Sequence, residues 1–152
     1  MKERIGRAVE LFKSGFNCSQ SVVAAFADMY GFTEEQSLRM AASFGGGIGR
    51  MRETCGAACG MFLLAGLETG ATDATDRQGK AANYALVQEL AAEFKKRNGS
   101  LICSELLGLK KKEPISITPE ERTIQYYAKR PCAKMVEEAA RIWVEYLENH
   151  PK

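Results

Sequence analysis

Residues 45–60 read GGGIGRMRETCGAACG, a glycine-rich turn that leads through a Cys-Gly-Ala-x-x-Gly segment into an apolar run. Glycine adopts backbone conformations that other residues avoid, so this stretch predicts a sharp break between two helices. Cysteine is the one soft, redox-capable residue present in number, at five positions: Cys18, Cys55, Cys59, Cys103 and Cys132. The single histidine is His150. Any reactive centre is therefore expected to be built from sulfur.

The composition is typical of a globular protein with an ordinary core. The chain has 152 residues, of which 45% are hydrophobic and 26% are charged. We expect one helical domain over residues 1–152. The net charge of +2 and the two short basic runs at 95–97 and 110–112, which lack interleaved aromatic residues, argue against a nucleic-acid partner.

The N-terminal segment 1–7 alternates charged and apolar side chains, where a secretory signal would need an uninterrupted apolar stretch. The longest apolar run, 61–67, is too short to span a membrane. We therefore expect a cytoplasmic protein whose thiols stay reduced. Five cysteines in that setting indicate redox chemistry, metal binding or burial, and not a static disulfide framework.

The spacing of apolar residues, together with residues typical of helix starts and ends, predicts helices through the first half of the chain. The expected helices are one from Ile5 to Phe12 ended by Gly15, one carrying Cys18 to Met29 closed by Gly31, one opened by a capping box at Thr33 to Gln36 and running to about Phe44, and one from Arg52 or Thr54 through Gly66. The glycine turn separates the last two of these.

The second half predicts further helices. These are a long helix capped within Asp73 to Asp76, with Tyr84, Val87, Ala91 and Phe94 facing inward and Gly99 at its end, a short one from Ser100 to Gly108 with Cys103 inside, one opened at Thr118-Pro119 and stopping before Pro131, and a last one with Cys132, Val136, Ala140, Trp143 and Leu147 on one stripe. Residues 110–118 are expected to be extended or irregular, without forming a sheet. The fold class is therefore an all-α, single-domain bundle of about seven or eight helices.

Cys55 is the leading candidate for a reactive thiol. It is expected in the first turn of its helix, where exposed backbone N–H groups and the helix dipole favour a thiolate. Arg50 and Arg52 would lower the thiol pKa further, whereas Glu53 would raise it. A single thiol on an apolar stripe is nevertheless more often a packing residue, so inert burial of the cysteines stays open.

The pair Cys55 and Cys59 lies on one helical face, with Cβ atoms roughly 5 to 6 Å apart. A disulfide needs about 3.8 Å between Cβ atoms, so a bond within this pair would strain the helix. The disulfide partner of Cys55 is therefore expected to come from another helix, with Cys18 as the leading candidate. Since histidine is nearly absent, a metal site would use thiolates, which suits zinc or an iron–sulfur cluster.

The glycine turn has two interpretations. Gly46, Gly47 and Gly49, together with Arg50, could present backbone N–H groups and a positive charge to an anionic cofactor. The turn lacks the Lys-Ser/Thr ending of a P-loop, so a tight turn between helices is the favoured interpretation. In the same way, the small residues at 56–60 could let a second helix approach closely.

At these residues the sequence resembles the C_GCAxxG_C_C family of redox-active proteins, which have spaced cysteines around a Cys-Gly-Ala-x-x-Gly motif. The resemblance covers nearly the whole chain and rests on Asn17 to Ser21, Phe44 to Arg50, Cys55 to Gly60, Cys103 and Cys132. It implies a helical protein in thiol redox or metal chemistry whose functional positions are Cys18, Cys55, Cys103 and Cys132. Cys59 occupies a variable position of the motif, so the family pattern assigns it no role.

The sequence is compatible with three functions. The first is a thiol–disulfide oxidoreductase in which Cys55 attacks, a second cysteine resolves the mixed disulfide and an external reductant restores the dithiol. The alternative is a binding module without turnover, in which Cys18, Cys55, Cys103 and Cys132 hold a metal or cluster or line a small-ligand pocket. The third is an interaction protein with inert core thiols. The electron donor or acceptor is unknown from the sequence, and a homo-oligomer stays open.

Overall fold

The computed structural model describes residues 1–109 and 116–152. Over these residues the chain forms eight α-helices and no strands, which confirms the all-α prediction. The α-helices are α1 (Glu3–Lys13), α2 (Cys18–Ala24), α3 (Glu34–Ala41), α4 (Gly56–Thr69), α5 (Arg77–Asn98), α6 (Cys103–Leu106), α7 (Ile124–Lys129) and α8 (Cys132–Asn149). Two 3₁₀-helices, η1 (Ala27–Tyr30) and η2 (Ala42–Phe44), follow α2 and α3.

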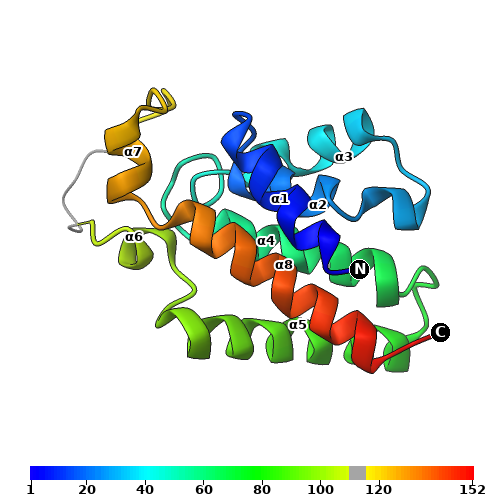
Figure 1. The fold of residues 1–152 in the computed structure, drawn as a ribbon. Helices are drawn as coiled ribbons and strands as arrows, with labels where there is room; N and C mark the ends of the chain where they lie inside the picture. The colour runs from blue at the N-terminus through cyan, green and yellow to red at the C-terminus, as the bar shows by residue number, and fades with distance from the viewer. Residues whose placement is uncertain (110–115) are drawn as a thin grey trace.

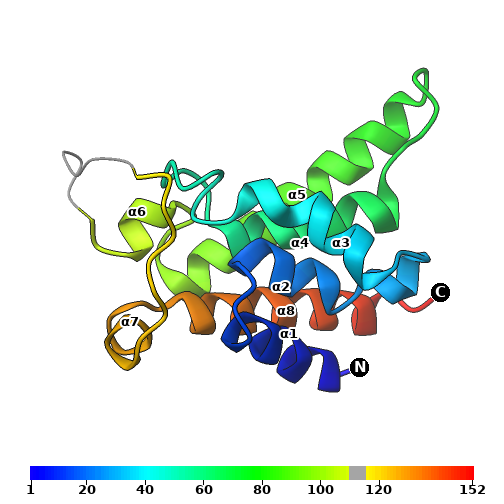
Figure 2. The ribbon, with the colours of Figure 1, turned by 90° about the horizontal axis from the view of Figure 1, so that it is seen from above.

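Helix α4 lies at the centre of the bundle and packs against α2, α5 and α8 (Figures 1 and 2). The largest fully buried side chains include Trp143, Phe12, Phe26, Phe94 and Met61, which come from five different elements or their junctions. One apolar core therefore unites the two ends of the chain. Nowhere in the described ranges is a helix both long enough and apolar enough to cross a membrane.

The predicted helix starts are confirmed where a local cap dictates them. Thr33 and Gln36 form the expected capping box, in which each side chain accepts a hydrogen bond from the other residue's backbone N–H. Asn17 and Gln20 form a second capping box at the start of α2. Asp76 caps α5 by accepting from Gly79. Capping of this kind depends only on residues within one turn.

Two predicted helices are wrong in their extent. The second expected helix breaks after α2, and its remainder forms η1 before Gly31 ends it in a left-handed conformation. The fourth begins at Gly56 and not at Arg52 or Thr54, because Thr54 pairs with Ile102 in an isolated bridge between two loop segments.

The helix predicted from Thr118-Pro119 stops before Pro131 as expected, but its predicted start is wrong, since α7 begins only at Ile124 with Thr123 as its cap. The segment 116–123 is instead held by arginines. Arg50 donates to the carbonyls of Ser116 and Thr118, and Arg122 donates to the carbonyl of Phe16 at 2.7 Å. These contacts to distant parts of the chain override the local helix signal. The rest of the predicted irregular segment, 110–115, lies outside the described residues.

The inward face of α5 differs in part from the prediction. Phe94 is buried as predicted, but Tyr84 is 62% exposed and the other buried positions are Leu86 and Leu90. Asn83 faces α4, where its amide donates to a backbone carbonyl. Alanine is common along this helix and gives only a weak apolar stripe, so contact with α4 and α8 decides which side turns inward.

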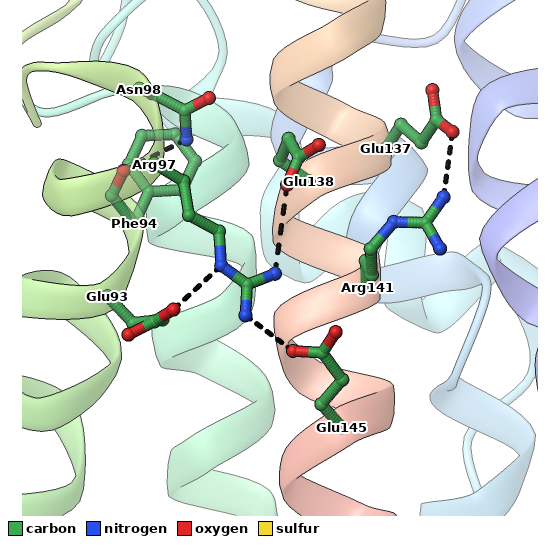
Figure 3. A network of polar contacts seen from close by, with 8 residues as sticks. All are labelled: Glu93, Phe94, Arg97, Asn98, Glu137, Glu138, Arg141 and Glu145. Atoms are coloured by element: carbon green, nitrogen blue, oxygen red, sulfur yellow. Dashed lines mark hydrogen bonds and ion pairs between the residues drawn. The ribbon is translucent and has the colours of Figure 1, made fainter.

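Arg97 links α5 to α8. Its guanidinium contacts Glu93 at 2.8 Å on its own helix and Glu145 at 2.5 Å and Glu138 at 3.8 Å on α8 (Figure 3). These groups are partly exposed, so each ion pair adds little to stability, and the network mainly fixes how α5 lies against α8.

Glycines let α2 lie very close to α4. A Cβ on Gly60 would lie 3.0 Å from both the Ser19 carbonyl oxygen and the Val22 Cβ. A Cβ on Gly56 would lie 2.8 Å from the Phe44 carbonyl oxygen and 3.4 Å from the Cys18 Cβ. The predicted packing role of the small residues in the Cys-Gly-Ala-x-x-Gly segment is therefore confirmed.

Substituting Gly56 by alanine should destabilise the protein by about 1–3 kcal/mol, because the new methyl group overlaps a backbone oxygen that cannot move freely. The matched control is Gly66→Ala in the same helix, where a Cβ meets nothing within 4 Å. This second change should stabilise the protein by about 0.5–1 kcal/mol. Denaturant unfolding measures both free energies, and equal effects would contradict the close-packing argument.

Candidate functional site

A cavity of about 300 Å³ opens at the end of the bundle where α8 begins. In both ribbon views, α6, α7 and the loop before α4 gather at this end (Figures 1 and 2). Its lining includes four of the five cysteines: Cys18, Cys55, Cys103 and Cys132. The structure thus brings together the four sequence-predicted site cysteines. Cys59 does not line this cavity, and its thiol lies 3.8 Å from the Thr54 carbonyl oxygen.

Each of the four cysteines stands at the start of a helix. Cys18, Cys103 and Cys132 are the first residues of α2, α6 and α8, and Cys55 occupies the N-cap position of α4 without a side-chain capping hydrogen bond. Four chain segments that are far apart in sequence therefore reach one cavity through their helix starts.

The loop before α4 has an unusual backbone. Five consecutive residues, 46–50, have positive φ angles between 58° and 75°, and Arg52 follows with a φ of 62°. Glycine adopts this left-handed conformation readily, but at Ile48, Arg50 and Arg52 it costs about 1–2 kcal/mol per residue in conformational free energy. Hydrogen bonds across the loop hold it, including Gly49 N–H to the Ser43 carbonyl at 2.7 Å. Strain retained beside a cavity is typical of functional sites.

The predicted anion-site residues Gly46, Gly47, Gly49 and Arg50 all line the cavity. Their binding of an anionic cofactor stays a prediction. Gly47 has a clear packing role as well, because a Cβ there would lie 2.5 Å from the Cβ of Cys103. The loop backbone therefore lies directly against this cysteine.

Backbone hydrogen bonds join the segments that carry Cys55 and Cys103. The Cys55 N–H donates to the Leu101 carbonyl at 2.8 Å, and the Cys103 N–H donates to the Glu53 carbonyl at 2.6 Å. Together with the bridge between Thr54 and Ile102, these bonds hold the two cysteines on adjacent stretches of backbone.

The expectation of an activated Cys55 is not met. Its side chain is nearly enclosed, with 5% of the residue exposed, and this burial raises the pKa of the Cys55 thiol to about 12. The backbone N–H groups of Ala57 and Ala58 lower the pKa, as expected at a helix start, but by less than desolvation raises it. Burial also raises the pKa of Cys59 to about 11 and that of Cys103, even though the Arg52 guanidinium lies 3.8 Å from the Cys103 sulfur.

Cys132 is the exception among the five thiols. A hydrogen-bonding contact with the Cys18 thiol lowers the pKa of Cys132 to about 7, and the positive charges of Arg130, Arg52 and Arg122 act in the same direction against desolvation. The same contact, with burial, raises the pKa of Cys18 well above its ordinary value. The arrangement therefore favours a Cys132 thiolate beside a protonated Cys18 thiol.

Sequence reasoning placed Cys132 in the set but missed its electrostatic role. Part of the signal was local, because Arg130 lies just before the helix that Cys132 begins, and an N-terminal helix position favours a thiolate. The charges of Arg52 and Arg122 come from distant segments, so no local pattern reveals them.

Four thiols around one cavity have the donor chemistry of a zinc or iron–sulfur site. Within 1–109 and 116–152, however, no three Cys, His, Asp or Glu side chains are placed close enough to hold a metal ion. The thiols as arranged in the described residues therefore do not fit a metal site.

The pKa difference among the thiols is directly testable. As pH rises, the alkylation rate of Cys132 should increase with a midpoint of about 7, below the midpoints of the other cysteines, because only the thiolate reacts. Cys18→Ala should move this midpoint upward by removing the largest favourable contact, whereas Cys59→Ala should leave it unchanged. Peptide mapping of alkylated protein by mass spectrometry measures each site. A Cys132 midpoint as high as that of Cys59 would contradict the assignment.

Comparison with known proteins agrees with this cysteine architecture. The model of a family described as "Putative redox-active protein (C_GCAxxG_C_C)" matches residues 16–146, a span that contains all four cavity cysteines. Searches of curated proteins and of solved structures found no match. With most of its length covered by the family model, the chain belongs to this C_GCAxxG_C_C family.

Proposed function

We propose that this protein carries out thiol–disulfide exchange, with Cys132 as the attacking thiolate and Cys18 as the resolving thiol. The observation that carries the proposal is that both cysteines line one cavity, where the pKa of Cys132 is lowered and that of Cys18 is raised. Membership of a redox-active family agrees with it. The proposal replaces Cys55 with Cys132 as the nucleophile.

The exchange has two steps. The Cys132 thiolate attacks one sulfur of a disulfide RSSR, forming a mixed disulfide with RS and releasing the other half as a thiolate. Cys18 then loses its proton to solvent and attacks the Cys132 sulfur, which forms the Cys18–Cys132 disulfide and releases the second RS thiolate. The substrate gains two electrons and the protein dithiol loses two. An external dithiol reverses both steps and restores the reduced protein.

The charges around Cys132 support the first step. Arg130, Arg52 and Arg122 stabilise the thiolate before attack, and the high pKa of Cys18 keeps that thiol protonated and unreactive until the mixed disulfide forms. Formation of the mixed disulfide removes the negative charge on Cys132, so it removes the largest cause of the raised pKa of Cys18. Attack by Cys18 then becomes easier.

Cys55 and Cys103 line the same cavity as neutral, buried thiols. Their raised pKa values argue against a role in the first attack. We assign them to the cavity wall, where Cys103 packs against Gly47 and lies beside the Arg52 guanidinium.

Reaction of the reduced protein with hydroxyethyl disulfide, a small neutral disulfide, tests this assignment. The wild type should form a Cys18–Cys132 link. Cys132→Ser should slow the reaction near neutral pH by at least roughly 15-fold, the ratio of thiolate fractions between a thiol of pKa about 7 and an unperturbed thiol of pKa about 8.5. Cys18→Ser should trap the mixed disulfide on Cys132, and Cys59→Ser should behave as wild type.

Disulfide mapping by mass spectrometry identifies the cysteine links and adducts in the wild type and in the three variants. A link between another pair of cysteines, or a trapped adduct on Cys55, would contradict the assigned roles. Metal analysis of protein purified without oxygen covers the alternative: stoichiometric metal, released when the thiols are modified, would favour the binding module.

A further inference from the structure

The wall of the cysteine cavity carries more positive than negative charge. Its charged residues, among those the structure describes, are four arginines and one glutamate: Arg50, Arg52, Arg122, Arg130 and Glu120. Glu120 is shared, since its carboxylate contacts Arg130 and lies 3.9 Å from Arg50. One carboxylate therefore faces four guanidinium groups.

The other contacts of these arginines do not neutralise them. Arg50 donates to the carbonyls of Ser116 and Thr118, and Arg122 donates to two carbonyls at the end of α1 and beyond it. A carbonyl satisfies an N–H group but leaves the positive charge in place. Arg52 contacts the Cys103 sulfur at 3.8 Å, and within the described part of the chain no carboxylate pairs with it.

Two of these guanidinium groups are largely shielded from solvent in the cavity wall. The side chains of Arg50 and Arg130 are only 17% and 15% exposed. Desolvation lowers the pKa of Arg50, and the nearby positive charge of Arg52 adds to that effect. Mutual repulsion of partly buried like charges is unfavourable, and a bound anion would relieve it.

The remaining wall restricts what that anion can be. Phe12, Leu106, Tyr126 and Met135 provide apolar surface. A volume of about 300 Å³ lies at the lower end of the range for small-molecule sites. The occupant is therefore expected to be small, with a short apolar chain and an anionic group.

We propose that the cavity binds a small organic disulfide that carries carboxylate groups, with a carboxylate at the arginines and the S–S bond at Cys132. This inference rests on the proposed function, because the ligand is the RSSR of the exchange described above. The same two steps then release two carboxylate-bearing thiolates and leave the Cys18–Cys132 disulfide. Binding through Arg52 and its neighbours would orient the S–S bond for attack.

Three disulfides of similar size and different charge test the proposal: dithiodipropionate, which is dianionic, hydroxyethyl disulfide, which is neutral, and cystamine, which is dicationic. Each rate with the reduced protein is divided by the rate with mercaptoethanol in the same buffer, which corrects for intrinsic reactivity. Dithiodipropionate should be favoured over hydroxyethyl disulfide by roughly ten-fold or more, with cystamine slowest, and added salt should reduce the preference.

Arg52→Gln should remove most of this preference. The ratio of the anionic to the neutral rate is the readout, because any change in the Cys132 thiolate affects both rates equally and cancels. The control is Arg39→Gln, which removes the same charge from an 81% exposed side chain on α3 outside the cavity. This variant should keep the preference.

Two failures are distinguishable. Equal corrected rates for the three disulfides would overturn the anion proposal and leave thiol–disulfide exchange standing. No reaction with any of them would overturn the proposed function. In that case a calorimetric titration with suberate tests the anion site alone, because suberate has the length of dithiodipropionate without the S–S bond. Suberate binding that Arg52→Gln abolishes would support the anion site. No binding of suberate to the wild type would overturn it.

Discussion

Close approach of backbone to backbone at glycine positions is the constraint on which the site depends. Gly56 and Gly60 let α2 lie against α4, and Gly47 lets the preceding loop lie against Cys103. A side chain at any of these positions would force apart segments that carry the cavity cysteines. The Cys-Gly-Ala-x-x-Gly motif therefore combines a thiol with the small residues that bring other thiols to it, and the strained loop follows from the same need for close contact.

The chemistry of the cavity comes from a balance between burial and positive charge. Desolvation raises the pKa of Cys55, Cys59 and Cys103, and at those positions no interaction outweighs it. At Cys132 the Cys18 contact and three arginines outweigh the same desolvation. One site can therefore hold neutral wall thiols beside one thiol of lowered pKa, and in the exchange proposed above the same arginines would supply the positive charge for an anionic substrate.

Local features of the sequence predicted much of the fold. The capping box at Thr33, the glycine that ends η1 at Gly31 and the apolar stripe of α8 each depend on neighbours within a few residues. The sequence-based predictions were wrong where contacts between distant segments of the chain determine the local structure. The segment 116–123 is not helical because arginines tie it to α1 and to the loop before α4, and α5 turns Tyr84 outward because packing on α4 and α8 sets its orientation.

The sequence by itself determined the helical order, the positions of the main caps, the set of four candidate cysteines and the family, since all of these lie in local patterns and spacing. Only the tertiary structure decided which cysteine has its thiol pKa lowered. That outcome depends on desolvation and on the charges of Arg52, Arg122 and Arg130, which come from separate segments of the chain. Electrostatic effects act through space. The position of Cys55 at a helix start predicts a lowered thiol pKa, but its burial, which the sequence does not show, raises that pKa by more.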